Sequence, residues 1–510
     1  MGATTTLGLA VPVLLGQVQT GKVVASQIPL PPPFRVPLPI PPVLIPSRNP
    51  AFPDADYFEI TQRVARQQIV PGVLTELWTY NGSYPGPTII SRSGVRTVVR
   101  HRNTLPVPTV VHLHGGHTPP GSDGFPTDLV YPQPGAAVPM KAMPGMESTG
   151  MHDPLARTSV GTRAYDYPIT QRAATLWYHD HRMSFTAQSV YRGLAGFHLI
   201  GDAEADALPL PRGDRDIPLM IADRSFAADG SLYYPALDPA ALSTPGTPDP
   251  YMGGVFGDVI LVNGAPWPVC EVQAVRYRLR LLNASNARRY QLGLSPQPPG
   301  GKGFTQVGSD GGLLRAPVRH DTIEIAPAER FDVVLDFSRY QVGQEVTLTN
   351  QLGSGTTARV MRFRITRRAA DATTIPAQLS TAEEVVTRQA ERTRSFAFQN
   401  HSRRSWTING KEFDPVHPVA TPRLGSTEIW RFTTDFHHSV HIHLVQFRVL
   451  SRDGKKPGPY DSGWKDTVDL KPAEETAVIA RFTDYPGRYV MHCHNLEHED
   501  MAMMATFTVT

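Results

Sequence analysis

Short runs of alternating apolar and polar residues recur along the chain. Val275, Tyr277, Leu279 and Leu281 alternate with arginines, and the stretch 361–365 (MRFRI) alternates in the same way. Because successive side chains of a strand point to opposite faces, each run predicts a strand with one buried and one polar face. Long helical periodicity is hard to find, and the 42 glycines and 49 prolines interrupt the chain every few residues. The pattern therefore predicts an all-β protein built from sandwich domains.

A threefold internal repeat accompanies this pattern. The segments TYNGSYPGPT, LVNGAPWPV and TINGKEFDP each contain a pair that favours a tight turn, namely Asn81-Gly82, Asn263-Gly264 and Asn409-Gly410. Similar strand-like segments, VVRHRN, LRLLN and IWRFT, follow these pairs at comparable distances. Three copies of one β-sandwich would produce such a repeat, and 510 residues are enough for about three domains.

The repeat and the composition together predict five segments. We expect a tail and proline-rich strap over residues 1–50, a first domain over 51–205, a second over 206–370, a linker over 371–392 and a third domain over 393–510. The strap contains PLPPPFRVPLPIPPVLIPSRNP. Such a segment lacks the amide donors of a sheet interior and favours an extended polyproline conformation.

The tail also contains an apolar run over residues 7–15, which is too short to span a bilayer. It resembles the apolar part of an export signal without a basic front end, followed by small residues at Ala25 and Ser26. A disordered tail is the alternative interpretation, so export is one of two possibilities and the compartment stays open.

The net charge indicates which kinds of partner to expect, and the cysteine content bears on the redox compartment. Lys and Arg number 49 and Asp and Glu 46, which leaves a formal charge of +3 without a basic run. We therefore expect no nucleic acid or membrane surface as partner, but a small molecule, and we expect a monomer. Two cysteines, Cys270 and Cys493, allow at most one disulfide and do not identify the redox compartment.

Ten of the 18 histidines fall into four short clusters, which are His112 and His114; His179 and His181; His438, His441 and His443; and His492, His494 and His498. Each cluster contains an H-x-H pair. Residues two apart on a strand share a face about 6.5–7 Å apart, so each pair can present two imidazoles to one metal cluster. Four pairs offer eight nitrogen ligands, which is more than one ion accepts and suits three ions with open positions.

Strand alternation predicts a second site around Cys493. Its side chain must point away from those of His492 and His494, and His438 faces away from His441 and His443 for the same reason. His498 and Met503 follow Cys493 at short spacing. Two imidazoles, a thiolate and a weak methionine are the donor set of a blue-copper electron-transfer site. Zinc would leave the methionine and most histidines without a role.

At this point the chain resembles the multicopper oxidases. The motifs HLHGGHTPPGSDG, LWYHDHRM, HSVHIHLVQFRVL and RYVMHCHNLEHEDMAMM are similar to that family's four copper motifs, and the likeness is closest to spore-coat-type bacterial laccases and bilirubin oxidases. The resemblance implies three cupredoxin-like Greek-key β-sandwich domains and four copper ions: one type 1, one type 2 and two type 3. It also implies a trinuclear site between the first and third domains.

The resemblance further implies a role for each ligand. Type 1 copper would be held by His438, Cys493, His498 and Met503, type 2 by His112 and His441, and the type 3 pair by His114, His179 and His494 on one ion and His181, His443 and His492 on the other. Glu499 and Asp123 resemble the family's proton-relay carboxylates. The alternatives are a surface charge for Glu499 and a turn-forming role for Asp123.

The implied activity is laccase-like oxidation of phenols or aromatic amines with reduction of O2 to water. The short segment TTDFHH differs from typical spore-coat laccases and places Asp435 and His437 where either could accept a substrate proton. Alternatives are bilirubin or o-aminophenol oxidation, cuprous oxidation in copper tolerance, and a non-enzymatic copper carrier. Cuprous oxidation would use the methionines of a Gly/Pro-rich loop, which are Met140, Met143, Met146 and Met151.

Overall fold

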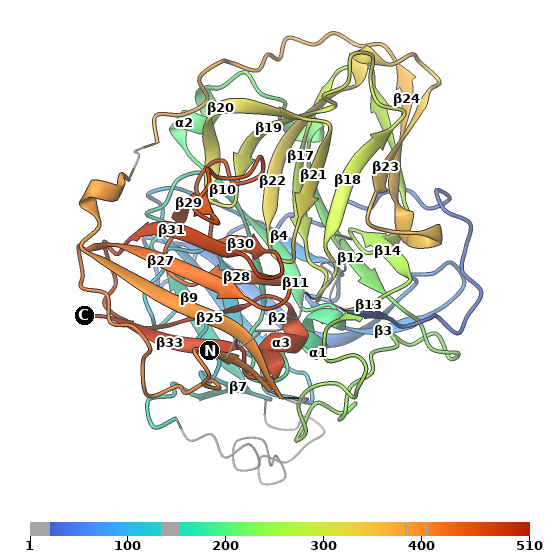
Figure 1. Ribbon diagram of the computed structural model, residues 1–510. Coiled ribbons are helices and arrows are strands. Elements are labelled where there is room, and N and C mark those ends of the chain that lie inside the picture. The colour runs from blue at the N-terminus through green and yellow to red at the C-terminus, as the bar shows by residue number, and fades with distance from the viewer. Residues whose placement is uncertain (1–20, 134–152, 383–384, 403–404) are drawn as a thin grey trace, which may run out of the picture.

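The computed structural model describes residues 21–133, 153–382, 385–402 and 405–510. Most strands belong to three pairs of sheets, which we call the first, middle and third sandwiches (Figure 1). Each pair encloses its own apolar core. The all-β prediction is confirmed, whereas the exact domain boundaries stay predictions.

The first sandwich pairs two four-stranded sheets. One has the order β3-β2-β5-β9, with β2 Asp56–Gln67, β3 Thr75–Tyr80, β5 Thr97–Asn103 and β9 Thr162–Tyr167; the other has the order β4-β11-β10-β6, with β4 Gly86–Arg92, β6 Val111–His114, β10 Ala174–Asp180 and β11 Ala195–Gly201.

The middle sandwich is larger. Its seven-stranded sheet has the order β15-β14-β12-β17-β22-β19-β20, with β12 Asp216–Arg224, β14 Val259–Val262, β15 Ala265–Pro266, β17 Arg276–Asn283, β19 Phe304–Ser309, β20 Gly312–His320 and β22 Arg330–Asp336. Its five-stranded sheet has the order β16-β24-β23-β18-β21, with β16 Val269–Gln273, β18 Tyr290–Ser295, β21 Thr322–Ile325, β23 Glu345–Asn350 and β24 Arg359–Arg367.

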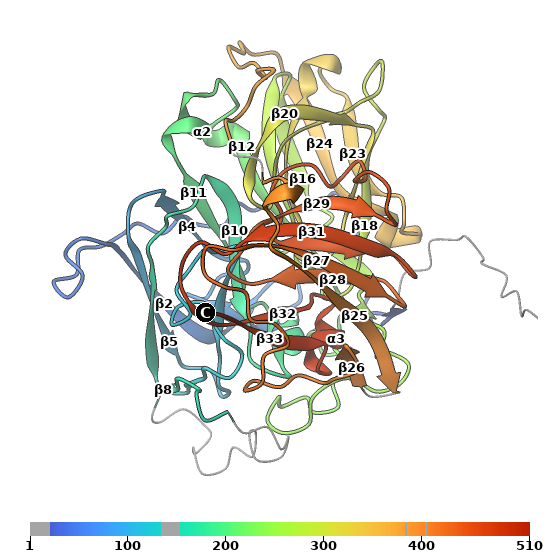
Figure 2. The same cartoon turned by 60° about the vertical axis from the view of Figure 1, so that its left-hand side comes forward.

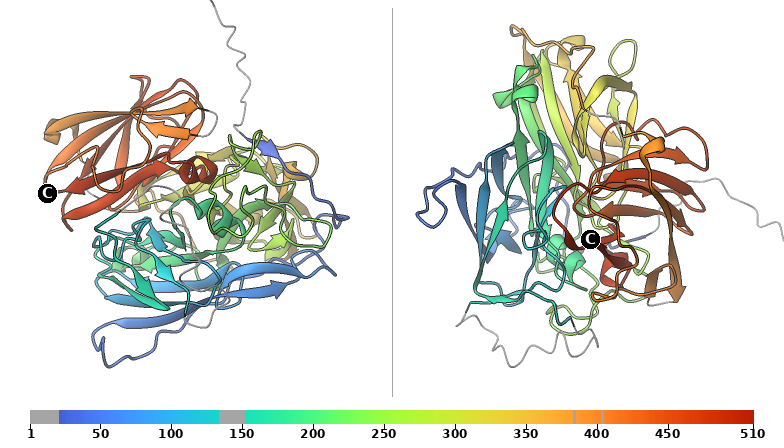
Figure 3. Two further views of the ribbon diagram at one scale, coloured as in Figure 1. Left: turned by 90° about the horizontal axis from the view of Figure 1, so that it is seen from below. Right: turned by 90° about the vertical axis from the view of Figure 1, so that its left-hand side faces the viewer.

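The third sandwich lies against both others (Figures 2 and 3). One sheet has the order β26-β25-β27-β31-β29, with β25 Arg392–Ser402, β26 Ser405–Ile408, β27 Thr427–Thr434, β29 Phe447–Arg452 and β31 Glu475–Arg481; the other has the order β30-β28-β32-β33, with β28 His438–Ile442, β30 Thr467–Leu470, β32 Gly487–Cys493 and β33 Met504–Val509.

Smaller elements complete the described part of the chain. Short strands pair as β1 Lys22–Val23 with β13 Val255–Phe256, and as β7 Val130–Tyr131 with β8 Ser159–Val160. The α-helices are α1 Thr186–Tyr191, α2 Ala203–Ala207 and α3 Leu496–Asp500, and the rest are 3-10 turns. None of the helices in the described residues has the length and apolar character needed to cross a membrane.

The predicted internal repeat is confirmed at its turns. Asn81, Asn263 and Asn409 all have positive φ (55°, 49° and 55°), as do the glycines that follow them. Each asparagine Oδ1 accepts a backbone N–H from a neighbouring strand of the same sandwich, at 2.7, 2.8 and 2.7 Å. In each sandwich that neighbouring strand pairs in parallel with the strand-like segment of the repeat, as β2 with β5, β12 with β17 and β25 with β27.

The prediction for the arginine-rich strand β17 is wrong on one face. The sequence predicts a polar, exposed face, yet Arg278 is only 8% exposed. Asp332 pairs with both Arg278 and Arg280, and Arg280 also donates a 3.0 Å hydrogen bond to Thr175 of the first sandwich. The face is buried because the first sandwich covers it. Buried arginines are tolerated there because carboxylates pair with them and compensate their charge.

The proline-rich strap links two sandwiches. The N–H of Leu38 donates to Val269 of the middle sandwich at 2.8 Å, and the N–H of Leu44 donates to Thr88 of the first sandwich at 2.9 Å. Between them, the Pro39 carbonyl accepts a 3.0 Å hydrogen bond from Asn263 Nδ2. The strap is therefore an extended segment that is anchored by isolated parallel β-bridges, Pro37 with Val269 and Val43 with Thr88, rather than by a continuous sheet.

Asn263 offers a test of the repeat and the strap together. Its amide also bonds to Met220 N–H and the Pro218 carbonyl, and the residue is 1% exposed. We expect Asn263→Ala to lower the free energy of unfolding by about 3 kcal/mol, because buried backbone groups lose partners and alanine disfavours positive φ. Calorimetry should show the shift. Asn409→Ala, at an exposed turn, is the matched control, and an equal loss there would contradict the argument.

Candidate copper centres

Cys493 and its predicted partners gather at one end of the third sandwich. Strand β32 ends at Cys493, and helix α3 then turns the chain back so that His498 meets His438 from β28. Cys493 Sγ lies 3.4 Å from His438 Nδ1 and 3.7 Å from His498 Nδ1, and the two nitrogens are 3.1 Å apart. All three residues are buried. Two imidazoles and a thiol that converge in this way match the in-plane donors of a blue-copper site.

Met503 is tied to the same group through the backbone. Its carbonyl accepts the Cys493 N–H at 3.1 Å, and its own N–H donates to the His498 carbonyl at 3.0 Å. The side chain is fully buried in the apolar core that contains Cys493. Burial in this apolar setting raises the pKa of the Cys493 thiol, so a nearby cation is needed to hold the thiolate.

Aromatic and acidic side chains cover the outer side of this group. The Trp406 ring stacks on His498 with 3.7 Å between centroids. Asp435 Oδ1 lies 3.2 Å from His438 Nε2, with 31% of the side chain exposed. Phe436 is 45% exposed and lies edge-on to Trp406 at 6.1 Å. The surface nearest to Cys493, His438 and His498 is therefore formed by aromatic rings and the carboxylate of Asp435.

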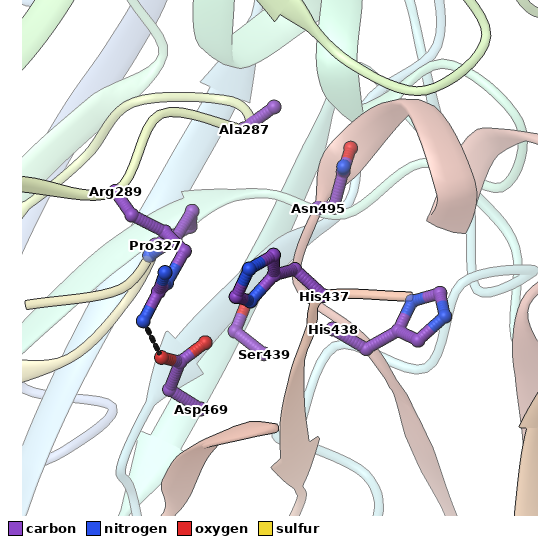
Figure 4. Close-up of a pocket in the computed structure, with 8 residues that line it drawn as sticks. All are labelled: Ala287, Arg289, Pro327, His437, His438, Ser439, Asp469 and Asn495. Carbon is purple, nitrogen blue, oxygen red and sulfur yellow. Dashed lines mark hydrogen bonds and ion pairs between the residues drawn. The ribbon is translucent and has the colours of Figure 1, made fainter. Parts of the chain in front are cut away.

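The prediction that His437 also lies at this rim is wrong. His437 and His438 point to opposite sides, as neighbours in extended chain do, and His437 enters a pocket beside Arg289 and Asp469 (Figure 4). His437 is 7% exposed there. The cavity measures about 10 Å³, which is room for roughly one water molecule. It is too small for an aromatic reductant.

The four H-x-H pairs meet between the first and third sandwiches. The ends of β6 and β10 supply two pairs, with His112 opposite His179, and the ends of β28 and β32 supply the other two, with His441 opposite His492. Nε2 of His112 lies 3.4 Å from Nε2 of His441, across the interface. Nε2 of His181 lies 3.2 Å from Nε2 of His492, also across it. Each sandwich thus contributes half of a single histidine cluster.

The groupings within this cluster follow the predicted trios in part. Ligand nitrogens of His181, His443 and His492 lie within 4.8 Å of one another, as the prediction of one type 3 ion requires. His114 and His179 instead share such a group with His112. The ring of His494 lies 5.1 Å from His114 and 5.3 Å from His179 between centroids, so this predicted trio is adjacent but less tightly gathered.

The hydrogen bonds of these rings show which nitrogens could bind a metal. Nδ1 of His112, His179, His441 and His492 faces a backbone carbonyl at 2.5, 2.8, 2.8 and 3.1 Å, so each Nδ1–H donates and Nε2 keeps its lone pair. Nε2 of His179, Nδ1 of His114 and both nitrogens of His494 are buried without a hydrogen-bond partner. Burial lowers the pKa of His114, His179 and His494, for His179 to about 3. Neutral, unpartnered imidazole nitrogens that converge in a dry site fit bound metal ions.

The two predicted relay carboxylates lie directly behind this cluster. Asp123 Oδ2 accepts a 2.8 Å hydrogen bond from His443 Nδ1. Glu499 Oε2 lies 3.1 Å from His492 Nδ1, and Oε1 lies 3.5 Å from His181 Nδ1. Burial raises the pKa of Asp123, whereas for Glu499 the two imidazoles outweigh burial and lower the pKa to about 2. Both acids are buried, so the surface-charge alternative for Glu499 is wrong.

Sequence reasoning missed a third carboxylate at the cluster. Asp466 Oδ1 lies 3.1 Å from His114 Nε2, and the Asp466 carbonyl accepts the Nδ1–H of His441. Asp466 stands 23 positions beyond His443, outside every histidine motif, so no local spacing marks it. Only the pairing of β28 with β30, which sets His441 opposite Thr467, brings it here.

Comparison with known proteins agrees with this geometry. Three multicopper oxidase family models match residues 63–141 with 148–205, 238–362 and 385–510. The chain is 38% identical to a laccase of Bacillus stratosphericus, covering 92% of this chain and 97% of that protein. The chain belongs to the multicopper oxidase family. It is therefore a copper-dependent oxidoreductase that uses O2 and an organic reductant, and the cupredoxin-like fold is confirmed.

Other relatives of this multicopper oxidase carry two named activities. It is 36% identical to a laccase of Bacillus subtilis (93% of this chain, 98% of that protein) and 35% identical to a bilirubin oxidase of Albifimbria verrucaria (96% and 83%). Among solved structures, a laccase from Pediococcus acidilactici matches with a TM-score of 0.80, 31% identity and 96% coverage of both chains.

Replacing the thiol should separate the two candidate centres. We expect Cys493→Ser to remove the intense blue absorption and more than 99% of the oxidase activity, because the thiolate is the donor that gives the colour. The cluster of eight histidines does not use the Cys493 side chain. Metal analysis should therefore still find about three of the four coppers. Retained blue colour would mean that another residue is the thiolate ligand.

Proposed function

We propose that this multicopper oxidase is laccase-like and oxidises phenols or aromatic amines one electron at a time while reducing O2 to water. One observation supports this above all: the end of β32 carries Cys493 between His492 and His494. The residues of the cysteine site and of the histidine cluster are therefore neighbours in one backbone segment. An electron accepted at the cysteine site has a covalent path to the cluster.

We assign the copper ligands as the resemblance implies. The proposed type 1 ligands are His438, Cys493, His498 and Met503; the type 2 ligands are His112 and His441; and the type 3 ligands are His114, His179 and His494, with His181, His443 and His492. Bound copper would supply the one-electron oxidation at the first centre and the four-electron reduction of O2 at the cluster. The chain itself orients these donors and excludes water from them.

The rim near His438 and His498 suits an aromatic reductant. The exposed ring of Phe436 offers a stacking surface, and Trp406 lies in contact with both Phe436 and His498. Asp435 presents a partly exposed carboxylate within 3.2 Å of His438 Nε2. A phenol or aniline that stacks on Phe436 would place its O–H or N–H within reach of an acceptor.

Bilirubin oxidation is a second candidate, favoured by the relative that carries that name at 35% identity. The rim would accept either class, because a tetrapyrrole also presents flat rings and N–H donors. Cuprous oxidation rests on Met140, Met143, Met146 and Met151, which lie outside the described residues.

An oxygen-electrode assay of the copper-loaded protein tests this proposal. We expect the ratio kcat/KM for a dimethoxyphenol or an aminophenol to exceed that for Cu(I) at least tenfold, since the rim is aromatic. Bilirubin is the third substrate in this assay. Its kcat/KM relative to that of the phenol decides between laccase-like and bilirubin oxidation. Oxidation of Cu(I) alone would contradict the laccase-like proposal.

The two carboxylates are proposed to deliver the four protons that O2 reduction consumes. Glu499 lies beside His181 and His492, and Asp123 holds His443, so each touches a proposed type 3 ligand. We expect Glu499→Gln to slow turnover at least tenfold while reduction of the blue centre by substrate stays fast, because the amide cannot carry a proton. Stopped-flow absorbance separates the two steps.

Asp123→Asn is the companion variant. It can still accept the hydrogen bond from His443 Nδ1, so copper content should persist while O2 consumption falls. If both amide variants consumed O2 at the wild-type rate, the carboxylates would only orient histidines.

A further inference from the structure

The middle sandwich supplies none of the proposed ligands, yet one of its arginines reaches the histidine cluster. Arg330 begins strand β22 and is fully buried. Its guanidinium Nε donates to the Thr175 carbonyl of the first sandwich at 2.8 Å. The same group forms a bidentate ion pair with Asp466 of the third sandwich, at 2.7 and 2.5 Å. Arg330 therefore lies where all three sandwiches meet.

Every donor of this guanidinium is used. Besides Thr175 and the two oxygens of Asp466, Nη1 donates to the Ala328 carbonyl and Nη2 to the Asp310 carbonyl, each at 3.1 Å. The Arg330 backbone N–H also donates to Asp310 Oδ1 at 2.7 Å. A planar group held at five points has one orientation, which fixes the carboxylate it grips.

Asp466 in turn contacts two histidines of the cluster. Its Oδ1 faces His114 Nε2 at 3.1 Å and also accepts the Thr467 hydroxyl at 2.9 Å. Its backbone carbonyl accepts Nδ1–H of His441 at 2.8 Å. Because carboxylate and carbonyl oxygens only accept, the proton lies on His114 Nε2 and on His441 Nδ1. The lone pairs are then on His114 Nδ1, which is buried without a partner, and on His441 Nε2, which faces His112.

A glycine in the first histidine motif makes room for this contact. Gly115 follows His114 with φ +85°, and a Cβ there would lie 2.6 Å from Arg330 Nη2 and 2.7 Å from Asp466 Oδ2. A side chain at this position would be strained by the backbone conformation and would displace both groups. The motif that carries two ligands is thus shaped to admit an arginine from another sandwich.

We propose that Arg330 is a positioning residue for the copper cluster: by fixing Asp466, it makes His114 present Nδ1 and His441 present Nε2. This inference rests on the proposed ligand roles of those two histidines. It gives the middle sandwich a part in the trinuclear site, although the sandwich contributes no ligand.

The alternative is an ion pair that only joins sandwiches, and the chain offers a matched control for it. Arg280, also in the middle sandwich, pairs with Asp216 at 2.7 Å and donates to Thr175 Oγ1 at 3.0 Å. It therefore joins the middle and first sandwiches as Arg330 does. Among the described residues, its carboxylate partners Asp216 and Asp332 form no hydrogen bond or ion pair with a histidine of the cluster.

The experiment compares Arg330→Lys with Arg280→Lys in the copper-loaded protein. Lysine keeps the charge but has three donors on one atom, so it cannot grip both Asp466 oxygens and three carbonyls. We expect Arg330→Lys to keep its circular dichroism and blue absorption but to change the electron paramagnetic resonance signal of type 2 copper. Copper retention at the cluster against a chelator should fall about 10- to 100-fold, as for other partners of metal-ligating histidines.

Asp466→Asn should change the type 2 signal in the same way, which keeps the test valid if Arg330→Lys folds poorly. Arg280→Lys should leave the signal and copper retention unchanged even where its thermal midpoint falls. An unchanged type 2 signal in both Arg330→Lys and Asp466→Asn, or an equal change in Arg280→Lys, would overturn the inference. Absence of blue and type 2 signals from the wild type would instead overturn the proposed function.

Discussion

The burial of eight imidazoles in one cluster is the constraint on which the rest of the structure depends. A buried imidazole needs a partner for its N–H, and a ligand also needs its other nitrogen free. Carbonyls of the chain meet the first need for four of the rings, as the Cys493 carbonyl does for His492. Carboxylates meet it for two more, as Asp123 does for His443 and Asp466 for His114, whereas neither nitrogen of His494 has a hydrogen-bond partner. The cluster can therefore exist only where strand ends from two sandwiches bring both rings and acceptors together.

Strand alternation explains why the grouping of the candidate ligands could be predicted from the sequence. Parity alone separates Cys493 from His492 and His494, and the structure places its Sγ beside His438 as expected. The Asn-Gly turns could be predicted for the same reason, since positive φ is a local property of those residues. Features set within a few residues of chain are visible in the sequence.

Features set by packing between sandwiches were not visible. The arginines of β17 alternate as a solvated face would, and only the cover provided by the first sandwich makes Arg278 a buried ion pair. Asp466 reaches His114 across 352 positions of sequence, so no spacing rule connects them. The prediction for His437 was wrong because the sequence does not show that the middle sandwich covers that side of β28.

Buried charge, not apolar contact alone, holds the sandwiches around the cluster. Near Arg330, Lys465 is fully buried and lies 3.0 Å from Glu329 and 3.3 Å from Asp310. Removing one member of such a network leaves an uncompensated charge and costs roughly 3–5 kcal/mol, far more than a surface pair. A network of that kind adds little net stability over apolar packing, but it tolerates few alternative arrangements. Its value here is geometric, because a displacement of Asp466 would change the direction of two proposed ligands at once.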